Sequence, residues 1–374
     1  MSASTRVVVV GGGIVAASVA YHLTREGVSV VVVEAGWPGP ATNAGAGIIC
    51  PWNDRGHDPN YELAADGARY YPELLGMLAE DGHAETSYAR VGALRVGEDT
   101  QRLDNIAAVL RSIRADRPEI GEVELVEPGE PQRRFPPLAP NLAGVWIGGA
   151  GRVDGRQIRD SLLGAAVSYG ASRMTGAASL DHAGARVTGV TVGQESVAAD
   201  AVVVAAGAWT AQVCAPAGWQ LPVGPQRGQI IHAEIPDADT GSWPVILPPA
   251  DPYLLTFPGS RVVFGATREH NSGFDYRTTV GGVGAMLSAA MDVAPGLAEA
   301  TLLETRIGFR PATSDGRPVI GKLTDGLIVA TGNGPEGLTA GPWTGLAAAA
   351  LALGQEPAMD LSPFDPARFR PGNP

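Results

Sequence analysis

The first thirty-four residues constrain the fold most, because a strand, a glycine-rich loop, a helix and a second strand follow one another without interruption. Residues 6–10 end in four consecutive valines, which is typical of a central parallel strand buried on both faces. Gly11, Gly13 and Ala16 come next at G-x-G-x-x-A spacing, an accepted form of the dinucleotide-binding fingerprint. The order of these pieces predicts a βαβ unit that binds a dinucleotide.

Each small residue of this loop has a physical role in such a site. Gly11 permits the tight turn, and Gly13 lets the backbone approach a pyrophosphate. We predict a helix from Ile14 to Glu26, with Gly27 as its left-handed C-terminal cap. The N–H groups at the start of this helix would face the diphosphate.

Glu34 ends the predicted second strand, residues 28–33. An acidic side chain at this position accepts hydrogen bonds from an adenosine ribose and repels a 2′-phosphate. Glu34 therefore argues against a phosphorylated nicotinamide cofactor. The fingerprint alone does not separate a flavin dinucleotide from a nicotinamide dinucleotide.

Three later segments also contain small residues or buried strands that end in a glycine turn. Residues 42–48 form a stretch of mostly small residues that can lie against an extended cofactor. A buried strand from Asp200 ends in Ala206-Gly207-Ala208-Trp209, and another from Asp325 reaches Gly332. The second strand leads through residues 333–339 into an Ala-rich helix.

Together with Gly308–Gly321, these segments resemble the D-amino-acid oxidase-like superfamily of flavoproteins over essentially the whole chain. The chain is most similar to the branch of glycine oxidases, sarcosine oxidases and D-amino-acid dehydrogenases. This resemblance implies an α/β fold in which a Rossmann-type FAD-binding domain is interleaved with an α+β substrate domain having a mostly antiparallel sheet. We expect the FAD-binding domain at 1–80, 145–220 and 310–374, and the substrate-binding domain at 81–144 and 221–309. Within the latter, the sequence predicts strands in 221–234, 245–257 and 261–267, and a helix over 278–291.

The resemblance also implies the residues that contact FAD. The expected cofactor-binding residues are Gly11, Gly13, Ile14, Val15, Glu34, Ala35, Thr42, Asn43, Ala44, Gly45, Ala46, Gly47, Ile48, Ala178, Ala206, Gly207, Trp209, Arg310, Asn333, Gly334, Pro335, Glu336, Gly337, Leu338 and Thr339. Relatives that attach FAD covalently use a Cys near the position of Arg310 or a His near Thr42. This chain has neither residue there, so we expect noncovalent FAD.

The resemblance to glycine oxidases, in which an Arg ahead of a Pro binds the substrate carboxylate, implies that Arg310 is the anchor of a substrate carboxylate. A guanidinium suits this role, because it pairs with a carboxylate through two parallel hydrogen bonds. The alternative is a structural Arg that binds loop carbonyls ahead of Pro311. Tyr253 falls where relatives place a hydroxyl that reaches the same carboxylate, or it is a half-buried strand residue. Ile48 falls beside the flavin. Trp52 lines the substrate pocket or fills the core.

The implied reaction is oxidation of glycine or an N-substituted glycine. Hydride passes from the substrate α-carbon to flavin N5, water hydrolyses the imine, and O2 reoxidises the flavin to give H2O2. The cofactor does the difficult chemistry, so anchoring residues are expected rather than a catalytic triad. The alternatives are a D-amino-acid dehydrogenase that reduces a quinone, a non-catalytic flavin-binding subunit and, least favoured, a nicotinamide-dependent dehydrogenase. The chain has Pro335-Glu336 where glycine oxidases carry a basic side chain, which leaves room for a substrate larger than glycine.

Charge and composition exclude other functions. A net charge of −12 argues against binding to nucleic acid, which needs a basic face. The six His and two Cys show no metal-ligand spacing, so we expect no metal. The apolar run at 345–353 is too short to span a membrane, and we see no leader sequence ahead of Arg6. These features favour a cytoplasmic protein that acts on a small-molecule amine carrying a carboxylate. They do not give an oligomeric state.

Overall fold

The computed structural model describes residues 5–52 and 58–370. Its first large sheet has six strands in the order β18-β19-β12-β1-β2-β8. Five of them are parallel, and β18 pairs with β19 antiparallel. The strands are β1 (Arg6–Val10), β2 (Ser29–Glu34), β8 (Ser172–Thr175), β12 (Ala201–Val204), β18 (Val319–Thr324) and β19 (Leu327–Thr331). The valines of β1 are buried on both faces, as their unbroken apolar run predicts.

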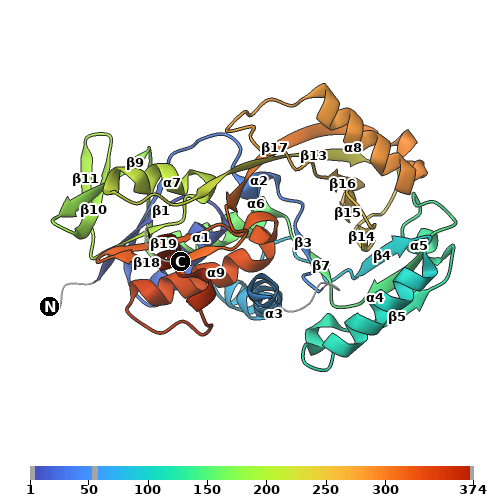
Figure 1. Ribbon diagram of the computed structural model, residues 1–374, viewed down its shortest axis with the longest axis horizontal. Helices are drawn as coiled ribbons and strands as arrows, with labels where there is room; N and C mark the ends of the chain where they lie inside the picture. Colours follow the sequence, from blue (N-terminus) through green and yellow to red (C-terminus); the bar gives the residue numbers. More distant parts are fainter. Residues whose placement is uncertain (1–4, 53–57, 371–374) are drawn as a thin grey trace.

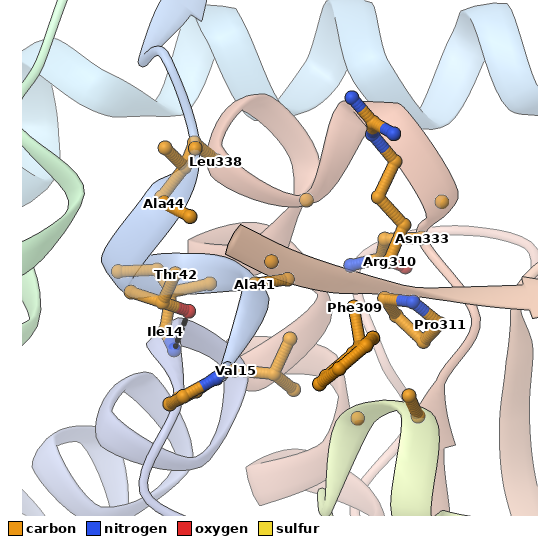
Figure 2. A pocket seen from close by; sticks show the side chains of 18 of the residues that line it. Ile14, Val15, Ala41, Thr42, Ala44, Phe309, Arg310, Pro311, Asn333 and Leu338 are labelled. Atoms are coloured by element: carbon orange, nitrogen blue, oxygen red, sulfur yellow. Dashed lines mark hydrogen bonds between the residues drawn. The ribbon is translucent and has the colours of Figure 1, made fainter. Parts of the chain in front are cut away.

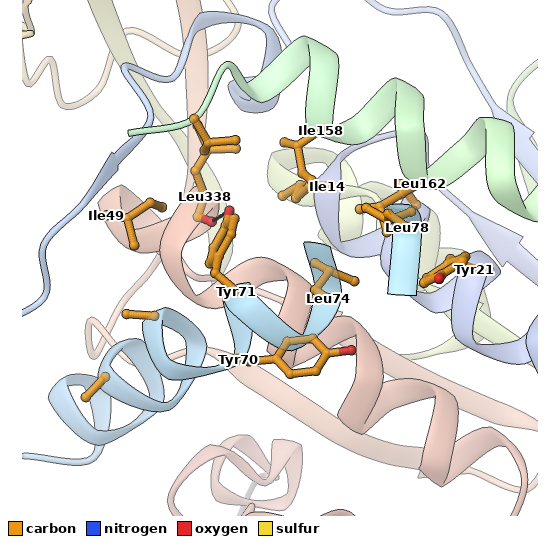
Figure 3. Close-up of a cluster of buried hydrophobic side chains, with 14 of the residues drawn as sticks. Ile14, Tyr21, Ile49, Tyr70, Tyr71, Leu74, Leu78, Ile158, Leu162 and Leu338 are labelled. Atoms are coloured by element: carbon orange, nitrogen blue, oxygen red, sulfur yellow. Dashed lines mark hydrogen bonds between the residues drawn. The ribbon is translucent and has the colours of Figure 1, made fainter. Parts of the chain in front are cut away.

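Helices cover the parallel sheet and support the loops at its edge (Figure 1). They are α1 (Ile14–Arg25), α3 (Pro59–Glu80), α6 (Gly155–Ser168) and α9 (Gly337–Ala352). The α1 and α9 helices approach closely, since the Ser18 hydroxyl donates to the Pro342 carbonyl at 2.6 Å. Figure 3 shows α3 bound to the start of α9, where the Tyr71 hydroxyl donates to the Leu338 carbonyl at 2.5 Å. This packing fixes the N-terminal end of α9.

The second large sheet has eight strands in the order β17-β13-β16-β15-β14-β4-β6-β5. All its pairings are antiparallel except β14 with β4. The strands are β4 (Ala93–Gly97), β5 (Val123–Val126), β6 (Ala143–Ile147), β13 (Val223–Glu234), β14 (Val245–Leu247), β15 (Tyr253–Phe257), β16 (Arg261–Gly265) and β17 (Thr301–Thr313). The associated helices are α4 (Thr100–Ile113), α5 (Glu130–Arg134) and α8 (Val280–Val293). One end of the long β13–β17 pair lies close to the parallel sheet (Figure 1).

Smaller elements complete the described chain. The remaining strands are β3 (Ile48–Ile49), β7 (Gly151–Arg152), β9 (Ala178–Ala183), β10 (Arg186–Val192) and β11 (Glu195–Ala198). The remaining α-helices are α2 (Ala41–Ala44) and α7 (Thr210–Cys214). The 3-10 turns are η1 (Pro118–Ile120), η2 (Gly207–Trp209), η3 (Ala215–Ala217), η4 (Pro295–Glu299), η5 (Gly334–Glu336), η6 (Ser362–Phe364) and η7 (Pro366–Phe369).

The predicted fold class is confirmed: a mostly parallel sheet lies beside a mostly antiparallel one. The N-terminal helix ends at Arg25, one residue before the predicted end at Glu26, and Gly27 has the predicted left-handed conformation, with φ 76°. Residues 42–48 are not all loop, because 41–44 form the short helix α2. The two sheets draw on interleaved segments of the chain. Since β6 and β17 span the expected borders at 145 and 310, the division into residue ranges stays a prediction.

Candidate active site

A cavity lies at the carboxyl ends of the parallel strands, which is where open α/β sheets bind their ligands. Its empty space is about 2140 Å³ including the open solvent at its mouth. The following predicted residues line it: Gly11, Gly13, Ile14, Val15, Glu34, Ala35, Thr42, Ala44–Ile48, Ala178, Ala206, Gly207, Trp209, Tyr253, Arg310 and Asn333–Leu338. The fold therefore gathers residues from both ends of the chain around one elongated space.

The glycine loop forms one end of the cavity. Gly11 has φ 133°, and a Cβ built on it would lie 2.3 Å from the Ala205 carbonyl oxygen, so no larger residue fits. The Ile14 N–H donates to Thr42 Oγ1 at 3.0 Å, which ties the first turn of α1 to α2 (Figure 2). The N-cap residue of α1, Gly13, has no side chain to cap the N–H groups that follow Ile14. The N-terminus of α1 is therefore a suitable site for a diphosphate.

Glu34, the last residue of β2, packs against this glycine loop. A Cβ on Gly12 would lie 2.1 Å from Glu34 Cδ, so the carboxyl group occupies the space that a side chain would take. Arg173 Nη2 is 3.6 Å from Glu34 Oε2 and holds it from β8. The arrangement fits the ribose of a dinucleotide that has no 2′-phosphate.

The start of α9 forms the far end of the cavity. Asn333 donates from Nδ2 to Thr344 Oγ1 at 3.2 Å, while its buried Oδ1 finds no hydrogen-bond partner among the described residues. A buried acceptor without a hydrogen-bond partner destabilises the folded protein unless a ligand donates a hydrogen bond to it. These groups are of the kind that would hold a dinucleotide such as FAD, with α1 suited to its diphosphate.

Arg310 projects from β17 into the cavity, while Phe309, its neighbour in the strand, is buried in an aromatic cluster (Figure 2). Its guanidinium lies over Gly228, where a Cβ would come within 2.6 Å of Nη1. Nη1 donates to the Thr267 carbonyl at 3.0 Å. No carboxylate in the described part of the chain forms an ion pair with Arg310. Burial lowers the pKa of Arg310, because a cation removed from water lacks its full compensation here.

Tyr253 lies on β15 and also lines the cavity. Burial raises the pKa of its hydroxyl, and the nearby positive charge of Arg310 opposes that rise. Tyr253 is therefore a neutral hydrogen-bonding group close to the guanidinium. Both expected roles, carboxylate binding and wall residue, are compatible with this position.

Two charged lining residues, Arg95 and Arg268, were not predicted, whereas Cys50, which the sequence left as a pocket-lining or core residue, does line the cavity. Arg95 Nη2 donates to the Trp52 carbonyl at 3.1 Å, and Arg268 Nε donates to Asp251 Oδ2 at 3.0 Å. Burial raises the pKa of the Cys50 thiol to about 11, so it stays protonated at neutral pH. Neither arginine lies in a motif. Only strand register, such as the pairing of Arg95 with Leu247, reveals that they face the cavity.

Three expected site residues do not line the cavity. Trp52 is 1% exposed and is packed in the core. Asn43 faces away, because its Oδ1 accepts a hydrogen bond from Arg159 Nη1 at 2.5 Å. The Thr339 hydroxyl donates to the Ile48 carbonyl at 3.0 Å and so supports the wall from behind.

None of the helices in 5–52 and 58–370 is both long and apolar enough to cross a bilayer. Over the same residues there is no cluster of His, Cys, Asp and Glu suited to a metal ion.

Known proteins match this chain over almost its full length. Residues 6–351 match the DAO family, described as FAD dependent oxidoreductase. An uncharacterised oxidoreductase of Bacillus subtilis, YurR, is 46% identical over 96% of this chain and 98% of its own. A glycine oxidase of Geobacillus kaustophilus is 30% identical over 96% of this chain and 95% of its own. The crystal structure of iminodiacetate oxidase from Chelativorans sp. BNC1 is 44% identical, with a TM-score of 0.93, over 96% of this chain and 99% of that one. The glycine loop, Glu34 and the start of α9 surround one cavity, and the matches cover almost the whole chain. The chain therefore belongs to the DAO family of FAD-dependent oxidoreductases and is glycine oxidase-like.

Proposed function

We propose that this chain is an oxidase of glycine or, preferentially, an N-substituted glycine. The substrate loses two hydrogens to become an imine, water hydrolyses the imine to an amine and glyoxylate, and O2 is reduced to H2O2. Noncovalently bound FAD would supply the acceptor for the hydrogen of the substrate α-carbon. We place the enzyme in the cytoplasm.

The observation that carries this proposal is Arg310, a partly buried guanidinium in the cavity with no ion pair to a described carboxylate. A cation in that position is best compensated by a carboxylate that it binds through two hydrogen bonds. Tyr253 lies near Arg310 in the cavity wall, and its hydroxyl would donate to the same carboxylate. Together they would fix an α-amino acid by its carboxylate and direct its α-carbon into the cavity.

The remaining wall suits this chemistry. Ile48, Leu247 and Ala266 give apolar surface beside the anchor. Cys50 is protonated, and no His in the described part of the chain lines the cavity. The side chains thus provide position and exclusion of water rather than a strong general base, which amine oxidation does not require.

The relatives support an N-substituted substrate. One of them is a glycine oxidase and another is an iminodiacetate oxidase, and iminodiacetate is glycine with a carboxymethyl group on its nitrogen. Pro335 and Glu336 line this chain's cavity where a basic side chain is typical of glycine oxidases. The proposal follows the iminodiacetate oxidase, which is the more similar of these two relatives.

Oxygen consumption by the purified holoenzyme tests the proposal. The substrates are glycine, sarcosine, N-ethylglycine, iminodiacetate and D-alanine. We expect the N-substituted glycines to consume O2 and to yield equal amounts of H2O2 and glyoxylate. Activity with D-alanine and a quinone, but not with O2, would instead identify a dehydrogenase. Acid precipitation should release the yellow colour; colour that remained in the pellet would show covalent FAD.

A further inference from the structure

We infer that the loop between β16 and α8, residues 269–279, is part of the cofactor site and slows the release of FAD. Its Phe274 does this by holding Trp209 and Phe309 against the end of the cavity where Glu34 lies. The inference rests on FAD being bound noncovalently, as proposed above, and it does not depend on which amine is the substrate.

A buried arginine of β13 fixes the shape of this loop. Arg227 is 6% exposed, and it donates to the Glu269 carboxylate and, at 3.1 Å, to the Asp275 carbonyl. Its Nη1 also forms an ion pair with Asp275 Oδ2 at 2.9 Å. Gln229, on the same strand, donates to Glu269 Oε1 at 2.7 Å and accepts from the Thr279 N–H at 2.9 Å. The loop is therefore bound to β13 at both of its ends.

Phe274 is the residue of this loop that packs against the cavity wall. Its ring stacks on Trp209, with the centroids 4.9 Å apart and the planes at 15°, and it meets Phe309 edge-on at 5.3 Å. Trp209 and Phe309 also contact each other, with their centroids 5.9 Å apart. Both of them line the cavity, and Phe274 does not. Phe274 is therefore a positioning residue, which acts on the cavity through two neighbours.

The same group of rings reaches the end of the cavity where Glu34 lies. Trp209 contacts Trp37, with the ring centroids 5.5 Å apart, and Trp37 lines the cavity as Glu34 does. A carboxylate at the position of Glu34 accepts hydrogen bonds from an adenosine ribose, so this is the adenosine end of the cavity. Aromatic rings are surfaces on which a base can stack. Phe274 therefore supports a wall that suits the adenosine half of FAD.

Gly39 joins the parallel-sheet side to the same rings. Its carbonyl accepts the Phe309 N–H at 2.9 Å. Gly39 has φ 83°, and a Cβ on it would lie 2.5 Å from the Phe309 ring and 3.1 Å from the Tyr276 ring. Tyr276 belongs to the 269–279 loop, and its ring centroid is 6.4 Å from that of Phe309. The segment that follows Glu34 and the 269–279 loop thus meet at Phe309.

The alternative is that these rings only fill the core. Core rings are covered on all sides, but Trp37 is 38% exposed and Tyr276 is 50% exposed. Both line a second hollow, which shares Glu34 and Trp37 with the main cavity. The group of rings therefore ends at an opening beside the adenosine end, and a dinucleotide that leaves by this opening has to displace them.

The first experiment measures release of FAD from the diluted holoenzyme through the change in flavin fluorescence. We expect Phe274→Leu to release FAD about tenfold faster, because it loses both aromatic contacts. Phe274→Tyr keeps the ring and should behave like the unaltered protein. Phe135→Leu is the matched control, since Phe135 also contacts a Trp ring, at 5.2 Å, but lies outside the cavity. Equal release from Phe274→Leu and the unaltered protein, or equally fast release from Phe135→Leu, would overturn the inference.

The second experiment assigns the effect to the adenosine end. ADP carries the adenosine half of FAD without the flavin, and calorimetry measures its binding to the full chain freed of FAD. We expect Phe274→Leu and Gly39→Ala each to weaken ADP binding about tenfold. Gly259→Ala is the control for Gly39→Ala, because Gly259 has φ 79° and no atom lies within 4 Å of its ideal Cβ.

The results separate the possible failures. ADP that binds Phe274→Leu as tightly as the unaltered chain, or that does not bind the unaltered chain, would overturn the assignment to the adenosine end. Neither experiment uses an amine, so both results stand even if the proposed oxidase activity fails. Acid precipitation separately tests the noncovalent attachment of FAD on which the release experiment rests.

Discussion

At the residue scale, Arg310 is held by backbone rather than by charge. Gly228 leaves the space that its guanidinium fills, and the Thr267 carbonyl fixes one nitrogen. The alternative expected from the sequence, an Arg that binds a loop carbonyl, is therefore also observed, as the hydrogen bond from Arg310 to Thr267. It does not replace the proposed role, because one carbonyl does not neutralise a buried cation.

Replacing Arg310 tests the anchor. Arg310→Gln keeps most of the side-chain volume but removes the charge and the two parallel hydrogen bonds. We expect kcat/KM for an N-substituted glycine to fall about 100-fold or more, with FAD still bound. Steady-state kinetics and the flavin absorbance of the purified variant measure both effects. Arg317→Gln, in an exposed turn outside the cavity, is the control, and equal kinetics in the two variants would remove Arg310 from the site.

Replacing Gly11 tests the nucleotide loop. In Gly11→Ala the new Cβ meets the Ala205 carbonyl oxygen at 2.3 Å and must push the two strands' ends apart. We expect purified protein with little or no FAD, measured as the ratio of flavin to protein absorbance. Gly27→Ala is a matched control, because Gly27 also has positive φ but no atom lies within 4 Å of its ideal Cβ. Full FAD content in Gly11→Ala would contradict this account of the loop.

At the element scale, the sequence predicted local structure well where one pattern decides it. The valines of β1, the glycine loop and Gly27 determine β1, α1 and the start of β2 without help from the rest of the chain. Arg95 and Arg268 were missed because their position in the cavity comes from pairing between segments distant in sequence, β4 with β14 and Glu269 with Arg227 on β13, which leaves no local pattern. Trp52 was expected to line the substrate pocket or to fill the core. The structure places it in the core, and only tertiary packing distinguishes the two.

The contact between α1 and α9 depends on small residues. A Cβ on Gly345 would lie 2.4 Å from Ser18 Cβ and 2.8 Å from the Val15 carbonyl oxygen. We expect Gly345→Ala to lower the free energy of unfolding by about 1–3 kcal/mol, measured by urea denaturation. Gly76→Ala in α3 should instead leave stability unchanged or raise it by up to about 1 kcal/mol, because nothing lies within 4 Å of that Cβ. Equal effects of the two substitutions would show that the α1–α9 contact is not tight.

At the scale of the whole molecule, buried neutral histidines make stability depend on pH. Burial lowers the pKa of His22 to about 4 and that of His232 to about 3. The unfolded chain takes up these protons below about pH 6.5, whereas the folded protein does not. The contribution of these two histidines to the free energy of unfolding is therefore fully present above pH 6.5 and is lost as the pH falls toward 4.

We expect the free energy of unfolding to drop by about 1.4 kcal/mol per pH unit for each of these histidines between about pH 6 and 4. Urea denaturation at fixed FAD concentration measures the slope. His22→Gln removes one titrating group and should make the slope shallower, whereas His270→Gln, at an exposed position, should leave it unchanged. A flat profile in the unaltered protein would rule out this explanation.

Both sheets contribute to the cavity, because its lining combines loops at the edge of the parallel sheet with residues of β13, β15 and β17 from the antiparallel sheet. The fingerprint predicted a dinucleotide but not its identity, and the proposed substrate-binding residues Arg310 and Tyr253 lie far from it in the sequence, on β17 and β15 of the antiparallel sheet. The fold class and family therefore followed from sequence more readily than the substrate.

The most direct test of the central claim is anaerobic mixing of the yellow protein with sarcosine or iminodiacetate while the oxidised-flavin absorbance is followed. Without oxygen, electrons taken from the amine stay on the flavin. We expect the absorbance to be lost in a substrate-dependent reaction and to return when air is admitted, with formation of H2O2. A flavin that remains oxidised with every N-substituted glycine and with glycine would contradict the claim that this chain is an oxidase of such amines.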